Sequence, residues 1–117
     1  LEDLIQFRNK NNFDLILMPS LNDVHQDHRT IANEALRAFK NTSILSYELI
    51  WNNFGFNPNC FIKLEQGDVD SKIKSLSYYK SQEKRNYSNP DFINSHMITR
   101  GIQANTKFAE AFEPLVD

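Results

Sequence analysis

The sequence predicts an α/β fold with a mostly parallel sheet flanked by helices. Short apolar runs at residues 13–18, 44–49 and 60–64 have the length and composition of buried strands. Apolar residues recur at helical spacing in two stretches. One, 28–39, lies between the first two runs, and the other, 68–79, follows the third. Strands that alternate with helices are typical of a sheet that is parallel at least at its centre.

The first element is the end of a helix. Leu1, Leu4 and Ile5 recur at helical spacing, and a polar stretch at 8–12 follows them. A chain that opens within a helix is expected to lack the amino-terminal part of its domain. We therefore expect residues 1–117 to be the C-terminal portion of a single domain with no internal boundary.

The next elements follow from apolar patterning. Pro19 closes the first strand, and an apolar stripe then predicts a helix from near His28 to Phe39. The second strand leads into an irregular stretch at 51–59, where Asn, Gly and Pro supply turn residues.

The second half of the chain carries helix-capping residues. Asp68 occupies an expected N-cap position, and residues 89–91 (Asn-Pro-Asp) provide an N-cap, a proline at the first helical position and an early acid. The helix that follows should end near Gly101. Residues 108–112 predict a final strand that stops before Pro114.

Composition excludes several classes of function. The formal net charge is −2, so no strong field attracts nucleic acid or an anionic membrane. No apolar run reaches the roughly 20 residues that span a bilayer, and no signal peptide is visible. The single cysteine, Cys60, fits a reduced compartment. We expect a cytoplasmic protein, and the sequence leaves self-association into a homo-oligomer open.

The most informative segment is 23–28, which holds two histidines and two carboxylates directly after a strand. His25 and His28 are three residues apart, so on a helical turn they share a face. Zinc binds neutral imidazole readily, and iron(II) suits a His/carboxylate site in a similar way. Asp27 can orient one of the rings by accepting its N–H. The segment therefore predicts part of a metal-dependent active site.

Residues 19–28 (Pro-Ser-Leu-Asn-Asp-Val-His-Gln-Asp-His) resemble the second motif, His-x-Asp-His, of the PIG-L and LmbE-like zinc-dependent de-N-acetylases. This family includes N-acetylglucosaminyl-phosphatidylinositol deacetylase and the deacetylases of mycothiol and bacillithiol synthesis. Further matches follow in order over nearly the whole chain, at Tyr47-Glu48, Pro58, Phe61, Lys74, Ser81-Gln82, Arg100-Gly101 and Ala109-Glu110-Ala111-Phe112.

The resemblance implies a Rossmann-like fold and a zinc-dependent hydrolase that removes the N-acetyl group from an N-acetylglucosamine-like sugar conjugate. In that scheme His28 is a zinc ligand, and His25 stabilises the tetrahedral oxyanion and helps to protonate the leaving amine. Asp27 tunes a neighbouring imidazole. Zinc would polarise the acetyl carbonyl and activate the attacking water, and oxyanion stabilisation of this type contributes about 3–4 kcal/mol.

The chain departs from the family pattern in one large respect. The first family motif, His-Pro-Asp-Asp-Glu, is absent. It would supply a second histidine ligand, an aspartate ligand and the general base. The resemblance thus implies that residues 1–117 hold one of three zinc ligands, and that this chain alone binds zinc poorly and catalyses little.

Three further residues are candidates for substrate binding, each with a structural alternative. Asp23 can reach substrate or a histidine, or it can form a turn. Arg100 can contact a sugar hydroxyl or phosphate, or it can serve the end of a helix. Glu110 pairs with a cation near the site or faces water, because an unpaired buried carboxylate is costly.

Two other readings of the sequence remain open. A metallo-β-lactamase-like hydrolase has a similar His-x-His-x-Asp-His motif, but it requires a histidine where Asp23 stands. A non-catalytic module could keep the fold and bind a sugar or a partner. The presence or absence of an upstream His-Pro-Asp-Asp-Glu motif discriminates this module from the enzyme.

Overall fold

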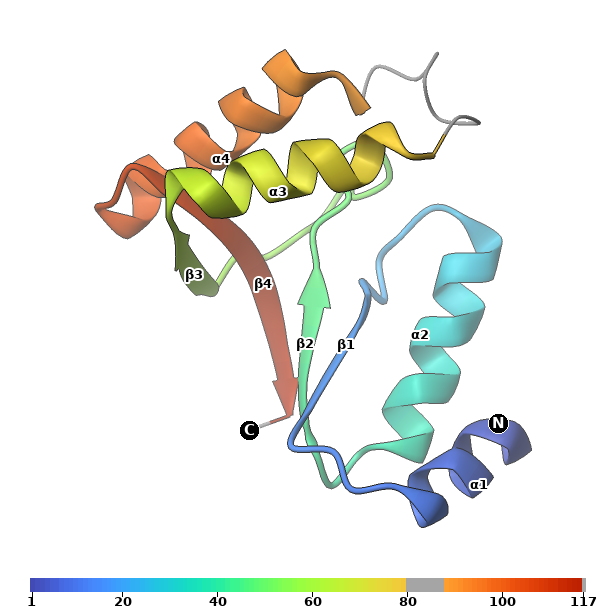
Figure 1. The fold of residues 1–117 in the computed structure, drawn as a ribbon. Coiled ribbons are helices and arrows are strands. Elements are labelled where there is room, and N and C mark those ends of the chain that lie inside the picture. Colours follow the sequence, from blue (N-terminus) through green and yellow to red (C-terminus); the bar gives the residue numbers. More distant parts are fainter. Residues whose placement is uncertain (80–87, 117) are drawn as a thin grey trace. The chain divides into compact units, whose positions relative to one another are not determined.

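A computed structural model of the protein describes residues 1–79 and 88–116 (Figure 1). The chain forms two compact units, one made of residues 1–60 with 112–117 and the other of residues 61–111. Ser81 and Gln82, which contribute to the family resemblance, lie outside the described residues.

The described strands form a mixed four-stranded sheet in the order β1-β2-β4-β3. The strands are β1 (Leu15–Pro19), β2 (Ser43–Tyr47), β3 (Cys60–Leu64) and β4 (Phe108–Val116). β1 and β2 are parallel, whereas β2 and β4 are antiparallel. The α/β class is confirmed, but the expectation of a mostly parallel sheet is wrong. Alternating helices and strands indicate crossover connections, yet the pattern does not encode the direction of each strand, and added antiparallel strands are common.

The core of the first unit forms between the parallel strands and helix α2 (Gln26–Ala38). Ala32, Ala35 and Ala38 are all buried on one face of α2, where they pack with Met18 and Ile44. Their small side chains allow the helix to approach the sheet closely, as Figure 1 shows beside β1 and β2. Helix α1 (Glu2–Lys10) and its N-cap Leu1 add Leu1, Leu4 and Ile5 to the same cluster, and the helix ends at Lys10, within the polar stretch at 8–12.

Among the described strands, β1 pairs on one side only, with β2, and it carries exposed apolar side chains. Leu15 and Leu17 are 46% and 54% exposed although they belong to a strand. An apolar groove of about 520 Å³ runs beside them, lined also by residues of both helices and, at the carboxyl end of the strands, by His28 and Tyr47. Exposed apolar strand edges favour pairing with another segment.

The second unit contains helices α3 (Gln66–Ser77) and α4 (Pro90–Ala104), which lie side by side (Figure 1). They share a core formed by Val69, Ile93, Met97 and Phe108. No helix in the described part of the chain is long and apolar enough to cross a membrane.

The helix starts in this unit partly match expectation. Asn89 caps α4 by accepting the backbone N–H of Asp91 at 2.7 Å, as predicted. The N-cap of α3 is Glu65 rather than Asp68. The Asp68 carboxylate instead accepts the backbone N–H of Glu65 at 2.9 Å from the N3 position. The N-cap and N3 residues of this capping box are both acidic. The sequence pattern therefore assigned the N-cap to Asp68, three residues after its true position.

Helix α4 ends beyond Gly101, at an Asn105 cap in the left-handed conformation with φ 56°. Thr106 N–H donates to the Gly101 carbonyl and Asn105 N–H to the Ile102 carbonyl, which is a Schellman motif. The strand after this turn also continues further than predicted, through Pro114 to Val116. A register shift opposite Pro114 explains this, because proline is tolerated at such irregularities.

Gly101 is required by a close backbone approach. A Cβ at this position would lie 2.6 Å from the Lys107 carbonyl oxygen and 2.7 Å from that of Thr106. We expect Gly101→Ala to lower the free energy of unfolding by about 1–3 kcal/mol through overpacking. Gly67→Ala is the matched helical control, because no atom lies within 4 Å of its Cβ, and it should be neutral or stabilising by up to about 1 kcal/mol. Urea denaturation of both variants measures the difference, and equal stabilities would contradict the steric account.

Candidate functional site

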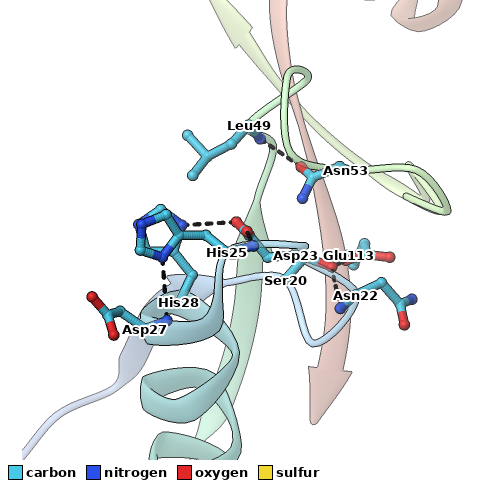
Figure 2. Close-up of polar contacts among 9 residues, drawn as sticks. All are labelled: Ser20, Asn22, Asp23, His25, Asp27, His28, Leu49, Asn53 and Glu113. Atoms are coloured by element: carbon cyan, nitrogen blue, oxygen red, sulfur yellow. Dashed lines mark hydrogen bonds and ion pairs between the residues drawn. The ribbon is translucent and has the colours of Figure 1, made fainter. Parts of the chain in front are cut away.

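The candidate site is the loop between β1 and α2, at the carboxyl end of the parallel pair (Figure 2). Open α/β sheets commonly carry their ligand sites at this position. The loop folds back at Ser20, whose carbonyl accepts the backbone N–H of Asp23 at 3.2 Å. Helix α2 then begins at Gln26 with His25 as its N-cap, two residues earlier than the sequence pattern predicts.

Asp23 is the centre of the loop. Its side chain is fully buried, and its two oxygens have different partners. Oδ1 accepts the backbone N–H of His25 at 2.7 Å, which forms an Asx turn. Oδ2 lies 2.9 Å from Nδ1 of His28. Two of the proposed roles for Asp23, forming a turn and reaching a histidine, therefore occur together.

The Asp23 contact determines which nitrogen of His28 is free. A carboxylate can only accept a hydrogen bond, so Nδ1 of His28 carries the proton that faces Oδ2. In the neutral ring Nε2 then has an unshared lone pair. The His28 side chain is 34% exposed, and a carboxylate behind an imidazole is the usual arrangement at metal-binding histidines. His28 therefore has the tautomer of a metal ligand.

His25 has the opposite tautomer. Its Nδ1 accepts the backbone N–H of Asp27 at 3.2 Å and so caps α2. With Nδ1 as an acceptor, the neutral ring carries its proton on Nε2 and can donate from there. A doubly protonated His25 would lose this cap, because Nδ1–H cannot accept.

The two rings lie together, as their three-residue spacing predicts. Their centroids are 4.4 Å apart with an interplanar angle of 22°, so the rings are stacked (Figure 2). His28 also lines the groove along β1. His25 is not a lining residue of the groove, but it is stacked on the His28 ring that is.

The carboxylate that contacts an imidazole in the structure is Asp23, and the orienting role expected of Asp27 stays a prediction. Asp27 contacts His25 through its backbone N–H, and its side chain is exposed. Asp23 holds the carboxylate contact to an imidazole. The sequence favoured Asp27 because it is adjacent to His28. In the structure, Asp23, which lies five residues before His28 in the loop ahead of α2, contacts the His28 ring.

The loop after β2, which contains Asn52 and Asn53, contacts the loop between β1 and α2. Val24 N–H donates to the Asn52 carbonyl at 3.0 Å, and Asp23 and Asn53 form an isolated antiparallel bridge. The Asn53 side-chain oxygen accepts the backbone N–H of Leu49 at 2.6 Å. Its amide nitrogen is buried without a hydrogen-bond partner in the described part of the chain.

Tyr47, at the end of β2, has a raised pKa. Burial raises the pKa of its phenol above the ordinary value of 10.0, and the negative charge of Asp23 raises it further. Above about pH 10 an unfolded chain releases this proton while the folded chain keeps it. The contribution of Tyr47 to the free energy of unfolding is therefore complete below that pH and is lost as the pH rises.

Tyr47→Phe should therefore flatten the alkaline loss of stability. We expect the free energy of unfolding of the variant to decline less than that of the wild type between about pH 9 and about pH 11. Denaturant titrations across this range measure both slopes. A slope unchanged by the substitution would contradict the assignment of the shift to Tyr47.

Glu113 is a buried carboxylate that the sequence analysis missed. It lies on β4, is 7% exposed and accepts three hydrogen bonds. The donors are the hydroxyls of Ser20 at 2.7 Å and Ser46 at 2.8 Å, and the backbone N–H of Asn57 at 2.9 Å. The available signal was a second glutamate, besides Glu110, in the apolar run near the end of the sequence.

The two remaining candidates belong to the second unit. Glu110 pairs with Lys72 of α3 at 2.9 Å, and both side chains are partly exposed. Glu110 thus has a cation partner within the second unit, and such a surface pair contributes about 0–1 kcal/mol. Arg100 donates from Nη1 to Gln103 Oε1 at 2.7 Å on α4. Substrate contact by either residue stays a prediction.

No group of three His, Cys, Asp or Glu side chains that could hold a metal occurs within residues 1–79 and 88–116. Among these residues, His28 presents an Nε2 lone pair of the kind that metal ions accept. No protein-family model matches the chain, and a search of curated proteins finds no matching relative.

Proposed function

We propose that this chain forms part of the active site of a zinc-dependent hydrolase that removes the N-acetyl group from an N-acetylglucosamine-like sugar conjugate. The observation that carries the proposal is the stack of His25 and His28, whose Nδ1 atoms have different partners, a backbone N–H for His25 and a carboxylate oxygen for His28. Hydrolysis of an amide with a metal ion needs both a lone-pair ligand and a nearby hydrogen-bond donor. The proposal also rests on the resemblance of residues 19–28 to the His-x-Asp-His motif of the de-N-acetylases.

The residues of this chain have separate roles in the proposed reaction. His28 would hold zinc, or iron(II), through Nε2 while Asp23 fixes its ring. Bound zinc would supply polarisation of the acetyl carbonyl and activation of water. His25 would donate from Nε2–H to the oxyanion that develops on the acetyl oxygen, an interaction worth about 3–4 kcal/mol in comparable sites.

The open edge of β1 provides a place for the missing ligands. A parallel strand added beside β1 would end next to the loop that carries His25 and His28, because parallel strands end at the same edge of a sheet. The apolar groove and the exposed Leu15 and Leu17 would be covered by the same addition. In this proposal the parallel part of the sheet becomes Rossmann-like, and the ligands and general base of a His-Pro-Asp-Asp-Glu motif lie on that strand.

Acetate release tests the proposed reaction. The complete gene product, loaded with zinc, is incubated with N-acetylglucosamine conjugates, and free acetate is measured with and without a chelator. We expect acetate release that stops on zinc removal and returns on zinc addition. Binding of the conjugates without any acetate release would contradict the hydrolase and support the sugar-binding module.

A further inference from the structure

We propose that Glu113 is a positioning residue that fixes the loop carrying Asp23, and through Asp23 the ring of His28, by its hydrogen bond to Ser20. The inference rests on the proposed function for its catalytic meaning. Its structural content, a coupling between Glu113 and His28, can be measured without that function.

The setting of Glu113 is costly for a purely structural residue. A carboxylate taken out of water needs strong compensation, and apolar replacements of buried charges are often as stable. No cation pairs with Glu113 in the described part of the chain, and three hydrogen-bond donors surround it instead. A carboxylate only accepts hydrogen bonds, so the hydroxyls of Ser20 and Ser46 must both point at its Oε1 atom. Glu113 thereby fixes the direction of both hydroxyls.

The hydrogen bonds connect Glu113 to the site through one residue. Ser20 is 1% exposed, and its hydroxyl donates to Glu113 while it accepts the backbone N–H of Asn22 at 3.1 Å. The Ser20 carbonyl accepts the backbone N–H of Asp23. A fixed Ser20 hydroxyl therefore holds the turn at residues 20–23, which places the Asp23 carboxylate beside His28 (Figure 2).

Ser46 provides an internal comparison. It lies directly opposite Glu113 in the strand register and donates to the same oxygen at nearly the same distance as Ser20. Ser46 belongs to β2 and not to the loop. A variant at Ser46 thus removes a similar hydrogen bond from Glu113 without touching the connection to Asp23.

The test uses the complete protein with Glu113→Gln, Ser20→Ala, the double variant and Ser46→Ala. The first readout is the imidazole ¹⁵N spectrum without zinc, which reports the Asp23–His28 hydrogen bond, and the second is zinc affinity. We expect Glu113→Gln and Ser20→Ala each to shift the His28 Nδ1 resonance and to weaken zinc binding by about 10-fold. The double variant should be no worse than either single variant.

Ser46→Ala should leave the His28 resonances and the zinc affinity unchanged even where its stability falls. The inference is overturned if Ser46→Ala changes His28 as much as Ser20→Ala does, or if Glu113→Gln lowers stability and leaves His28 unchanged. A wild type that releases no acetate while the spectral coupling holds would overturn the proposed function and leave the positioning role of Glu113 supported.

Discussion

Replacing His28 by alanine in the complete protein is expected to abolish stoichiometric zinc binding and, with it, acetate release. The substitution removes the Nε2 lone pair, and it also leaves Oδ2 of the buried Asp23 without its partner. An unsatisfied buried group of this kind costs about 1–3 kcal/mol, so stability should fall as well. Metal analysis after gel filtration measures the first effect and urea denaturation the second.

His28→Gln separates the two consequences, because its amide can still donate to Asp23 but offers no imidazole nitrogen. We expect it to lose zinc and to retain more stability than His28→Ala. His25→Asn is the matched variant at the neighbouring ring, since asparagine is a favoured N-cap and preserves the start of α2. It should keep zinc and lose turnover by about 100- to 1,000-fold, the usual effect of removing one oxyanion donor. Equal zinc loss at both positions would refute the division of roles.

Asp23→Asn should lower zinc affinity by about 10- to 100-fold, as is common when the partner of a metal-binding histidine is changed. The asparagine oxygen can still accept the backbone N–H of His25. Its amide nitrogen would then face Nδ1 of His28 and favour the tautomer with the proton on Nε2, which cannot bind a metal. Calorimetric zinc titration measures the affinity.

Asp27→Asn is the control for this change, because the Asp27 side chain is exposed and its backbone N–H makes the contact to His25. Zinc affinity should be close to that of the wild type in this variant. If Asp27→Asn weakened zinc as much as Asp23→Asn, the resemblance would have identified the orienting carboxylate correctly and the geometry would be misleading.

Local patterns predicted much of the fold. Apolar alternation and helical spacing located every described strand and helix to within a few residues, and the Asn89 cap was correct. The errors arose where tertiary structure overrides local preference. Gly101 looks like a helix terminator, but it is needed for close approach to the carbonyls of residues 106 and 107, and the helix ends at Asn105.

The site was predictable where its residues are neighbours in sequence. His25 and His28 meet because helical geometry brings residues three apart together. Glu113 and Ser20 are 93 positions apart and meet only through the pairing of β4 in the sheet, which no local pattern reports. The contact of Asp23 with His28 depends on the hydrogen bonds of the turn that contains Asp23. Adjacency in sequence favoured Asp27 instead.

The most direct test of the account is the imidazole ¹⁵N spectrum of the complete protein during zinc addition. The account predicts that His28 begins with its proton on Nδ1 and that its Nε2 resonance moves to a metal-bound position at one equivalent of zinc. His25 should keep its proton on Nε2 throughout. Metal-bound shifts on both rings, or on neither, would contradict the assignment of His28 as ligand and His25 as donor.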